Sequence, residues 1–361
     1  MFSSPLLEPE RSQLPPVLRN RLGSWLSGPP RGPRTTRYRT AIFQLDRLGD
    51  AVLTLSAIRL LLQNRTDAES LLVLTDAAAP LLAIEFPAIP RIVLPTAAPG
   101  VLRNILPLWR RARPQFGPVQ AEQTICLSHN RNLYKEVAVS WLDSKQVLQL
   151  DRRTYPQTFP PDSCFELEAH RQLLAATLQR RVTPGEVLPR FDHVPTSEGM
   201  DLLVCPLASE TIRCIPASLL LAALGHWRRR SRAPITLCGQ REQSAALQNL
   251  AATITAAGQG PARVVLPAGI PELVQLIAEA GAVLAAETGP AHIATALDKR
   301  VITVVGGGTH GLCYPWRRSE RQQIISNPLP CYGCGWQCTQ SETYCLTGID
   351  AATLAAALPP L

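Results

Sequence analysis

The sequence has few aromatic residues and almost no lysine. Aromatic residues make up 5% of the 361 positions, and lysine occurs only at Lys135, Lys145 and Lys299. No stretch of about 18 uncharged apolar residues is present, so we expect no membrane-spanning helix. The first residues include Glu8, Glu10 and Arg11 and lack the apolar core of a secretory signal. These absences predict a cytoplasmic protein.

The hydrophobic content and length indicate an ordinary globular protein. Hydrophobic residues make up 46% of the chain, which argues against a disordered or fibrous class. A chain of 361 residues is long enough for two domains, each with its own core.

The positive charge is concentrated at the start of the chain. Residues 1–40 hold seven arginines against Glu8 and Glu10, which is most of the net charge of +8. The remaining residues carry too small an excess for a nucleic-acid-coating domain, so we expect no nucleic-acid partner. The Pro/Arg-rich extension 1–38 has the composition of a segment that contacts the anionic head groups of the inner membrane surface. A solvated leader without a function would have the same composition.

Four of the ten cysteines form a cluster. Ten cysteines without a secretory signal argue against a disulfide framework. The pattern Cys331-x2-Cys334-x3-Cys338-x6-Cys345 places four thiols at the spacing of a closed tetrahedral site, for which Zn is the default and Fe the alternative. Four protein ligands leave no open position, so the expected metal is structural. Disulfides or free buried thiols are the competing interpretations.

The chain organisation indicates two α/β domains. Apolar strand segments alternate with helical patterns at 41–45, 51–63, 71–76, 78–86 and 91–95. A polar, proline-containing linker covers about 186–200, after which the alternation restarts. We expect strands at 201–206, 233–239, 262–267, 282–287 and 300–308, with helices at 217–229, 242–257, 271–280 and 290–297.

This pattern predicts two Rossmann-like doubly wound parallel-sheet domains. We place the N-terminal domain at 39–190 and the C-terminal domain at 200–325, followed by the cysteine knot and a C-terminal helix at 326–361. Ligands of such sheets bind at the carboxyl ends of the strands, often on helix N-termini. The two domains are therefore expected to face a cleft that holds an anionic ligand, a nucleotide.

The turn RLGD places an acidic residue where a helix begins. Gly49 permits a tight turn, and Asp50 is expected to face the cleft. A carboxylate there serves either as a general base or as a helix N-cap without a catalytic role.

The segment AETGPAHIATAL resembles a diphosphate-binding turn. Glu287 ends a strand, Thr288 is a good N-cap, and Gly289 leaves room before the helix. Free N–H groups and the helix dipole there favour a diphosphate. His292 either reaches that ligand or bonds to a neighbouring side chain. In VVGGGTHG, Gly306 and Gly307 either let a ligand approach the backbone closely or form a mobile turn.

These segments together resemble the heptosyltransferases of glycosyltransferase family 9. RLGDAVLTLSAIRLLL and PAIPRIVL resemble their N-terminal signature. The segment from PELVQLIAEA to VITVVGGG resembles their nucleotide-sugar signature. FELEAHRQLLAATL resembles their interdomain stretch, and PLASETIRCIP resembles the loop with a basic phosphate contact. The match runs from about residue 40 to the end of the chain.

The resemblance implies a GT-B fold and an inverting transfer from a nucleotide-diphosphate donor, usually ADP-heptose, without a catalytic metal. By position, Asp50 would be the general base, and Arg213 would bind the departing diphosphate where the family usually has Lys. Thr288, Gly289 and His292 would line the donor pocket, with Glu287 replacing a more frequent Asp. A branch of the family ends in a similar cysteine knot and glycosylates proteins, so the acceptor is a lipopolysaccharide-type lipid-linked saccharide or a protein.

Other functions fit parts of the pattern. A nucleotide-sugar epimerase would have the same double-wound shape. A zinc-knot binding protein would use the extension and the cysteines. The replacements at Arg213, Glu287, Ser56 and Leu207 would also fit a degenerate transferase retained as a scaffold.

Overall fold

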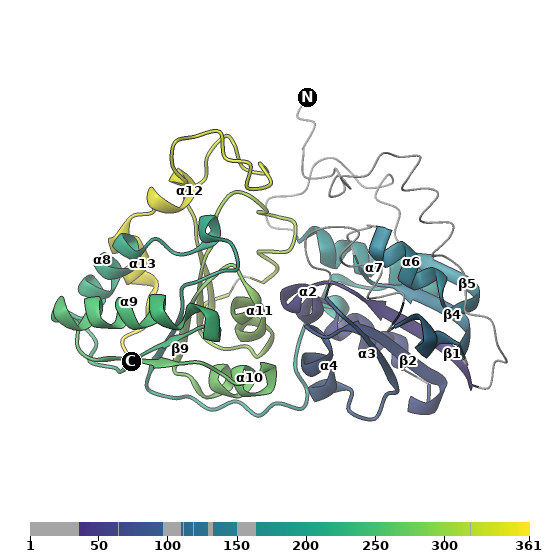
Figure 1. The fold of residues 1–361 in the computed structure, drawn as a ribbon. Coiled ribbons are helices and arrows are strands. Elements are labelled where there is room, and N and C mark those ends of the chain that lie inside the picture. Colours follow the sequence, from purple (N-terminus) through teal and green to yellow (C-terminus); the bar gives the residue numbers. More distant parts are fainter. Residues whose placement is uncertain are drawn as a thin grey trace. The chain divides into compact units, whose positions relative to one another are not determined.

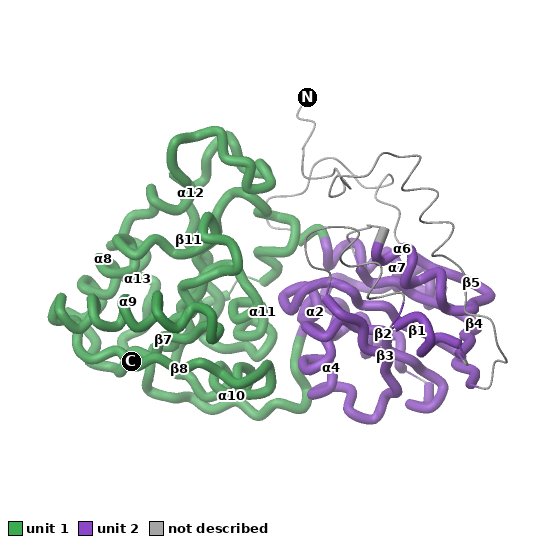
Figure 2. Tube along the Cα trace, in the orientation of Figure 1, with its two compact units in different colours: residues 1–6, 157–165, 190–361 green, residues 7–156, 166–189 purple. Residues whose placement is uncertain are grey.

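A computed structural model describes most of the chain beyond the extension. The described residues are 36–63, 65–96, 110, 112–117, 119–128, 133–149, 164–317 and 319–361. They form two compact units, which Figure 2 colours separately. We call residues 36–149 and 166–189 the N-terminal unit, and residues 164–165 and 190–361 the C-terminal unit. Within the described residues, no helix combines the length and the apolar character needed to cross a membrane.

The N-terminal unit contains a five-stranded parallel sheet (Figure 1). Its strand order is β3-β2-β1-β4-β5, with Ile42 at the centre paired to Leu72 and Ile125. The strands are β1 (Thr36–Gln44), β2 (Ser70–Thr75), β3 (Arg91–Leu94), β4 (Val119–Cys126) and β5 (Asp143–Gln149). Strand β1 begins inside the segment that the sequence assigned to the extension; the rest of that extension, 1–35, lies outside the described residues.

Helices cover both faces of this sheet and enclose an aromatic core. Phe116 lies between Phe43 and Trp141, with ring centroids 6.4 and 5.8 Å away. The helix expected at 51–63 is divided at Thr54, whose Oγ1 donates to the carbonyl oxygen of Ala51 at 2.8 Å. The helices are α2 (Leu48–Leu53), α3 (Leu55–Leu62), α4 (Ala79–Glu85), α6 (Leu133–Ser140) and α7 (Phe165–Leu178).

The C-terminal unit contains a six-stranded parallel sheet of order β11-β10-β9-β6-β7-β8. Its strands are β6 (Leu202–Cys205), β7 (Ile235–Cys238), β8 (Ala262–Val265), β9 (Ala282–Ala286), β10 (Val301–Val304) and β11 (Gln322–Ile325). Four of them, β6, β7, β9 and β10, are buried at every position, as expected for parallel strands covered on both faces. The helices are α8 (Ala217–Trp227), α9 (Ser244–Ala256), α10 (Ile270–Glu279) and α11 (Gly289–Ala296).

The C-terminal residues are part of this second unit. Helix α12 (Tyr344–Thr347) follows the cysteines, and helix α13 (Ala351–Ala357) packs against α8. Leu354 and Leu358 belong to the same buried cluster as Trp227, whose Nε1 donates to the carbonyl oxygen of Pro359 at 2.7 Å. Residues 326–361 therefore complete the core of the C-terminal unit.

Each sheet has a topological switch point. This is a pair of adjacent strands from which the following strands are added toward opposite edges of the sheet. It lies between β1 and β4 in the N-terminal unit and between β6 and β9 in the C-terminal unit. Open α/β sheets bind ligands in the crevice at the carboxyl ends of such strands. Both units are thus doubly wound α/β domains, as the sequence predicts.

Candidate functional site

The switch point of the C-terminal unit brings Arg213 and Glu287 together. Arg213 ends a short 3-10 turn, Thr211–Arg213, in the loop after β6, and Glu287 directly follows β9. Nη2 of Arg213 donates to the carbonyl oxygen of Glu287 at 2.8 Å. The Glu287 carboxylate is buried and its Oε1 accepts from Thr309 Oγ1 at 3.3 Å. A cationic side chain is therefore fixed at the crevice between β6 and β9.

Helix α11 begins directly beside this contact. Its N-cap is Thr288, which has an extended backbone (φ −148°, ψ 179°) and makes no side-chain hydrogen bond to the helix. The Thr288 hydroxyl donates instead to the carbonyl oxygen of Ala286 at 3.3 Å. Gly289 and Pro290 form the first turn, so the helix begins as the sequence predicts.

His292 lies in an aromatic cluster on α11. It is buried, and its Nδ1 accepts a hydrogen bond from Nε1 of Trp316 at 3.1 Å. Its ring stacks on Trp316 and meets the edge of Tyr314, at centroid distances of 6.4 and 5.2 Å. The sequence left two interpretations of His292 open, a contact with the ligand or a hydrogen bond to a neighbouring side chain. The contact with Trp316 matches the second interpretation. Its role in donor binding stays a prediction.

The glycine loop after β10 is covered by aromatic rings of the chain itself. A Cβ atom on Gly306 would lie 2.5 Å from a ring atom of Trp336, and one on Gly307 would lie 2.3 Å from Tyr332. Gly333 N–H donates to the carbonyl oxygen of Gly307 at 2.8 Å. In the structure, the close approach that the glycines permit is made by the cysteine segment, residues 331–345. Donor binding by Gly306 and Gly307 stays a prediction.

The cysteine segment places its four thiols around one small cavity. Cys331, Cys334, Cys338 and Cys345 line a space of about 20 Å³ together with Ile212 and Trp336. None of the four forms a disulfide. Burial raises the pKa of Cys345, and the neighbouring cysteines, when ionised to thiolates, raise it further. A cation would offset that repulsion, so the donor set fits a thiolate-bound metal. Within this segment no three sulfur atoms lie within 4.8 Å of one another, so a single Zn²⁺ requires them to move closer.

Asp50 lies beside the switch point of the N-terminal unit. It is the third residue of α2, and its Oδ2 accepts from the backbone N–H of Arg47 at 3.3 Å. The N-cap is Arg47, so of the two interpretations of Asp50 that the sequence left open, the one as N-cap is wrong. Asp50 still stabilises the helix start, because this contact is the carboxylate half of a capping box.

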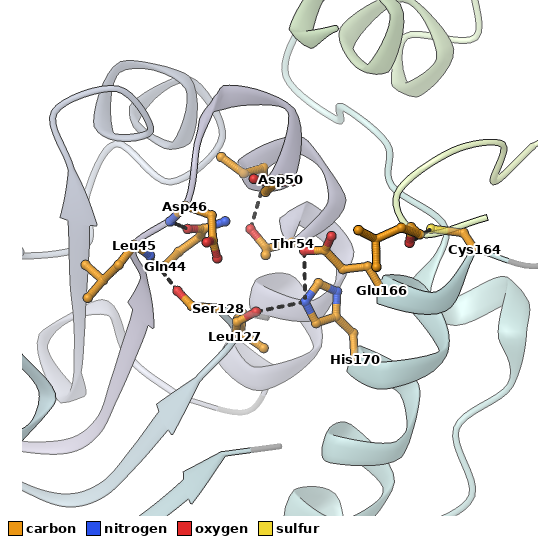
Figure 3. Close-up of polar contacts among 12 residues, drawn as sticks. Gln44, Leu45, Asp46, Asp50, Thr54, Leu127, Ser128, Cys164, Glu166 and His170 are labelled. Carbon is orange, nitrogen blue, oxygen red and sulfur yellow. Dashed lines mark hydrogen bonds and ion pairs between the residues drawn. The ribbon is translucent and has the colours of Figure 1, made fainter. Parts of the chain in front are cut away.

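The buried Glu166 on α7 lies next to Asp50, and the buried His170 on the same helix lies next to Glu166 (Figure 3). Carboxylate oxygens of Asp50 and Glu166 lie within 4.8 Å of each other. Oε1 of Glu166 is 4.0 Å from Nε2 of His170, which in turn lies 3.1 Å from the carbonyl oxygen of Leu127. Sequence reasoning missed this Glu–His pair, although the i, i+4 spacing in FELEAHRQ was the available signal.

The loop before Asp50 is held by a buried ion pair. Lys135 on α6 pairs with Asp46, and both side chains are almost fully buried. Leu45 N–H donates to Ser128 Oγ at 2.8 Å, which ties the end of β1 to the residues after β4. The carbonyl oxygen of Asp46 accepts from Thr75 Oγ1 at 3.1 Å. These contacts fix the backbone from which α2 and Asp50 start.

Comparison with known structures identifies this architecture as the GT-B fold. The E. coli heptosyltransferase WaaC with ADP has a TM-score of 0.60 at 18% identity, over 80% of this chain and 92% of that one. A family 9 glycosyltransferase from Veillonella parvula has a TM-score of 0.63 at 12% identity, over 91% and 97%. The iron-containing dodecameric glycosyltransferase TibC from enterotoxigenic E. coli has a TM-score of 0.53 at 15% identity, over 90% and 76%.

The match to a family model lies in the C-terminal unit. Residues 190–344 match the model of glycosyltransferase family 9 (heptosyltransferase). No curated protein matches the chain. The resemblance to family 9 is thereby confirmed over this segment, and it supports a glycosyltransferase.

Proposed function

We propose that the chain is an inverting glycosyltransferase that transfers a heptose from ADP-heptose to an acceptor hydroxyl. The acceptor is a lipopolysaccharide-type lipid-linked saccharide or a protein. The observation that carries the proposal is the Arg213 guanidinium, held at the β6–β9 switch point by the carbonyl oxygen of Glu287. The similarity of the fold to the E. coli heptosyltransferase WaaC and to the E. coli ADP-heptose heptosyltransferase II supports the same choice.

The donor diphosphate binds between this guanidinium and the start of α11. The N-terminus of a helix carries partial positive charge and unpaired N–H groups, which favour phosphate oxygens. Thr288 and Gly289 supply that N-terminus, and its first turn is not capped by the Thr288 side chain. Arg213 and the helix dipole stabilise the charge that develops on the leaving diphosphate, so no catalytic metal is required. The loops that surround the proposed diphosphate site are shaped by Glu287, His292, Gly306 and Gly307.

Asp50 is the general base of the proposed reaction. The acceptor oxygen attacks the anomeric carbon of the sugar while Asp50 takes the hydroxyl proton. The bond from the anomeric carbon to the diphosphate oxygen breaks, and the nucleoside diphosphate leaves with that electron pair. A single displacement of this kind inverts the configuration of the anomeric carbon.

A structural metal is the proposed cofactor of the cysteine segment. Cys331, Cys334, Cys338 and Cys345 would bind Zn or Fe as thiolates, and the metal would hold the segment together. One structural neighbour, TibC, is described as iron-containing, which supports Fe as a candidate beside Zn. The proposal further places the protein in the cytoplasm, with the extension 1–38 at the inner membrane surface.

A donor screen tests the function. We expect ADP-heptose at ~100-fold over its Kd to stabilise the protein by about 2.7 kcal/mol, visible as a raised Tm, while UDP-sugars and GDP-sugars give no shift. A shift with another nucleotide sugar would overturn the choice of donor. The absence of a shift with every donor would argue for a scaffold. Conversion of the bound sugar without an acceptor would indicate an epimerase.

A further inference from the structure

Trp336 of the cysteine segment contacts the guanidinium proposed to bind the donor. Cζ of Arg213 lies over the Trp336 ring, 5.8 Å from its centroid. The same guanidinium donates to the Glu287 carbonyl oxygen at 2.8 Å. Arg213 is therefore held between the loop before α11 and an indole ring that comes from a distant part of the sequence.

The position of the Trp336 ring is itself fixed by the backbone. Trp336 has a φ of +63°, which a bulky residue adopts only where the surroundings hold it. Gly335 N–H donates to the carbonyl oxygen of Gly308 at 3.0 Å. A Cβ on Gly306 or Gly308 would lie within 2.5 Å of the ring, so only glycines allow the indole to lie there. The ring is thus a rigid surface against which Arg213 is oriented.

Two hydrogen-bond donors at this contact lack an acceptor. Nε of Arg213 and Nε1 of Trp336 are both buried, and within the described part of the chain neither has a hydrogen-bond partner. Buried N–H groups without a partner are rare and unfavourable in folded proteins. The buried donor on the Arg213 guanidinium indicates an acceptor that the chain does not supply, such as an anionic oxygen of a ligand.

We propose that Trp336 is a positioning residue that holds Arg213 in place at the phosphate-binding end of the donor site. This rests on the proposed function, because it assigns Arg213 to the donor diphosphate. A cation over an aromatic face is stabilised by the ring, and a guanidinium held in one orientation loses less entropy when it binds phosphate. The cysteine segment then contributes to donor affinity in addition to its structural role.

Titration calorimetry with ADP, UDP and GDP on the full chain tests this inference. We expect Trp336→Leu to weaken binding of the preferred nucleotide at least about fivefold, and Trp336→Phe, which keeps a ring, to stay within about twofold of wild type. Arg213→Ala is expected to weaken binding more than Trp336→Leu. The double variant Arg213→Ala/Trp336→Leu is expected to bind no more weakly than Arg213→Ala alone, because Trp336 acts through Arg213.

Controls separate this effect from loss of structure. Tyr344→Leu removes an aromatic ring from the same segment and should leave nucleotide affinity unchanged. Thermal unfolding and metal content are measured for every variant. If Trp336→Leu does not fold, Trp336→Met replaces it, because a flexible thioether fills the volume without an aromatic face.

The outcomes distinguish the two proposals. Wild-type affinity in a folded Trp336→Leu or Trp336→Met protein, together with weak binding by Arg213→Ala, would overturn the role of Trp336 and leave Arg213 in place. The role of Trp336 would also be overturned if Trp336→Leu lowered nucleotide affinity by the same factor in the wild-type protein and in Arg213→Ala. Wild-type affinity of Arg213→Ala, or no binding of any nucleotide by the wild type, would contradict the proposed function itself.

Discussion

Asp50 contributes to the stability of α2 as well as to the chemistry proposed for it. Its Oδ2 accepts from Arg47 N–H in the first turn, where a negative charge is favoured by the helix dipole. This contact also limits the orientations of the carboxylate. A general base must be held in a defined position relative to the proton it removes, so the capping contact and the catalytic role are compatible.

Replacement of Asp50 separates these two roles. Asp50→Asn retains an oxygen that accepts from Arg47 but cannot take a proton, so we expect transfer to fall ~10²–10⁴-fold with the fold intact. Nucleotide affinity should be unchanged, because the residues proposed to bind the donor are in the other unit. Release of ADP in the presence of acceptor, together with ADP titration, measures both quantities.

A matched control is Asp67→Asn, which removes the same charge from the first turn of another short helix in the same unit. It should retain full transfer. Full transfer by Asp50→Asn would leave Asp50 only its contribution to the helix.

The Asp46–Lys135 ion pair makes a separate prediction about stability. Both side chains are at most 8% exposed, so removal of one partner leaves a buried charge without its counter-charge. We expect Lys135→Met to lower the free energy of unfolding by about 3–5 kcal/mol. The double variant Asp46→Leu/Lys135→Met should recover most of that loss. Urea denaturation of the three proteins measures it, with Lys145→Met, whose side chain is 80% exposed, as the near-neutral control. Equal stability of Lys135→Met and wild type would contradict the prediction.

At the scale of elements, the strands buried on both faces were the most predictable. LLVC of β6 and AVLAA of β9 are continuous apolar runs, because helices cover both sides of a parallel sheet. Edge strand β5 (DSKQVLQ) was not predicted, since most of its residues are exposed and its sequence has no apolar run. Strand β11 (QQII) was missed as well.

The candidate sites were predictable only where the signal is local. The Thr288–Gly289 helix start and the four cysteines follow from short motifs. The contacts of Arg213 with Glu287 and Trp336 join segments that are far apart in the sequence, so no spacing rule predicts them. The glycine loop shows the same limit. Its composition indicates a close approach, but tertiary packing decides that Tyr332 and Trp336 make it.

The cysteine segment predicts a bound metal. We expect the purified protein to contain about one Zn or Fe per chain, and Cys334→Ser to contain little of either. Because metal binding to thiolates contributes to folding, loss of the metal should also lower the Tm. Elemental analysis and thermal unfolding check both expectations. Cys126→Ser, which changes a cysteine in the other unit, should retain the metal. A wild-type protein with four free thiols and no metal would contradict the assignment.

At the scale of the whole molecule, each unit has its own hydrophobic core. The larger cluster runs from Leu202 to Leu358 and is contained in the C-terminal unit, with the partly buried Trp336 and Cys345 packed against it. The second cluster runs from Ala41 to Leu142 and lies in the N-terminal unit. The match to family 9 begins at residue 190, which is also where the long continuous part of the C-terminal unit, residues 190–361, begins. The larger hydrophobic core, the match to family 9 and the proposed donor site therefore all belong to the same segment of the chain.

A fragment of residues 190–361 is consequently expected to fold and to bind the donor nucleotide without the rest of the chain. A segment with a complete core unfolds cooperatively, and all residues proposed to contact the diphosphate lie within it. We expect its affinity for ADP to be within about tenfold of that of the full chain. Transfer should be absent, because Asp50 belongs to the other unit. Circular dichroism during thermal unfolding and ADP titration make the test, with Arg213→Ala in the fragment as the control for specific binding. A folded fragment that does not bind ADP, while the full chain does, would show that the N-terminal unit supplies donor contacts, and the assignment of the donor site to Arg213 and α11 would have to be extended.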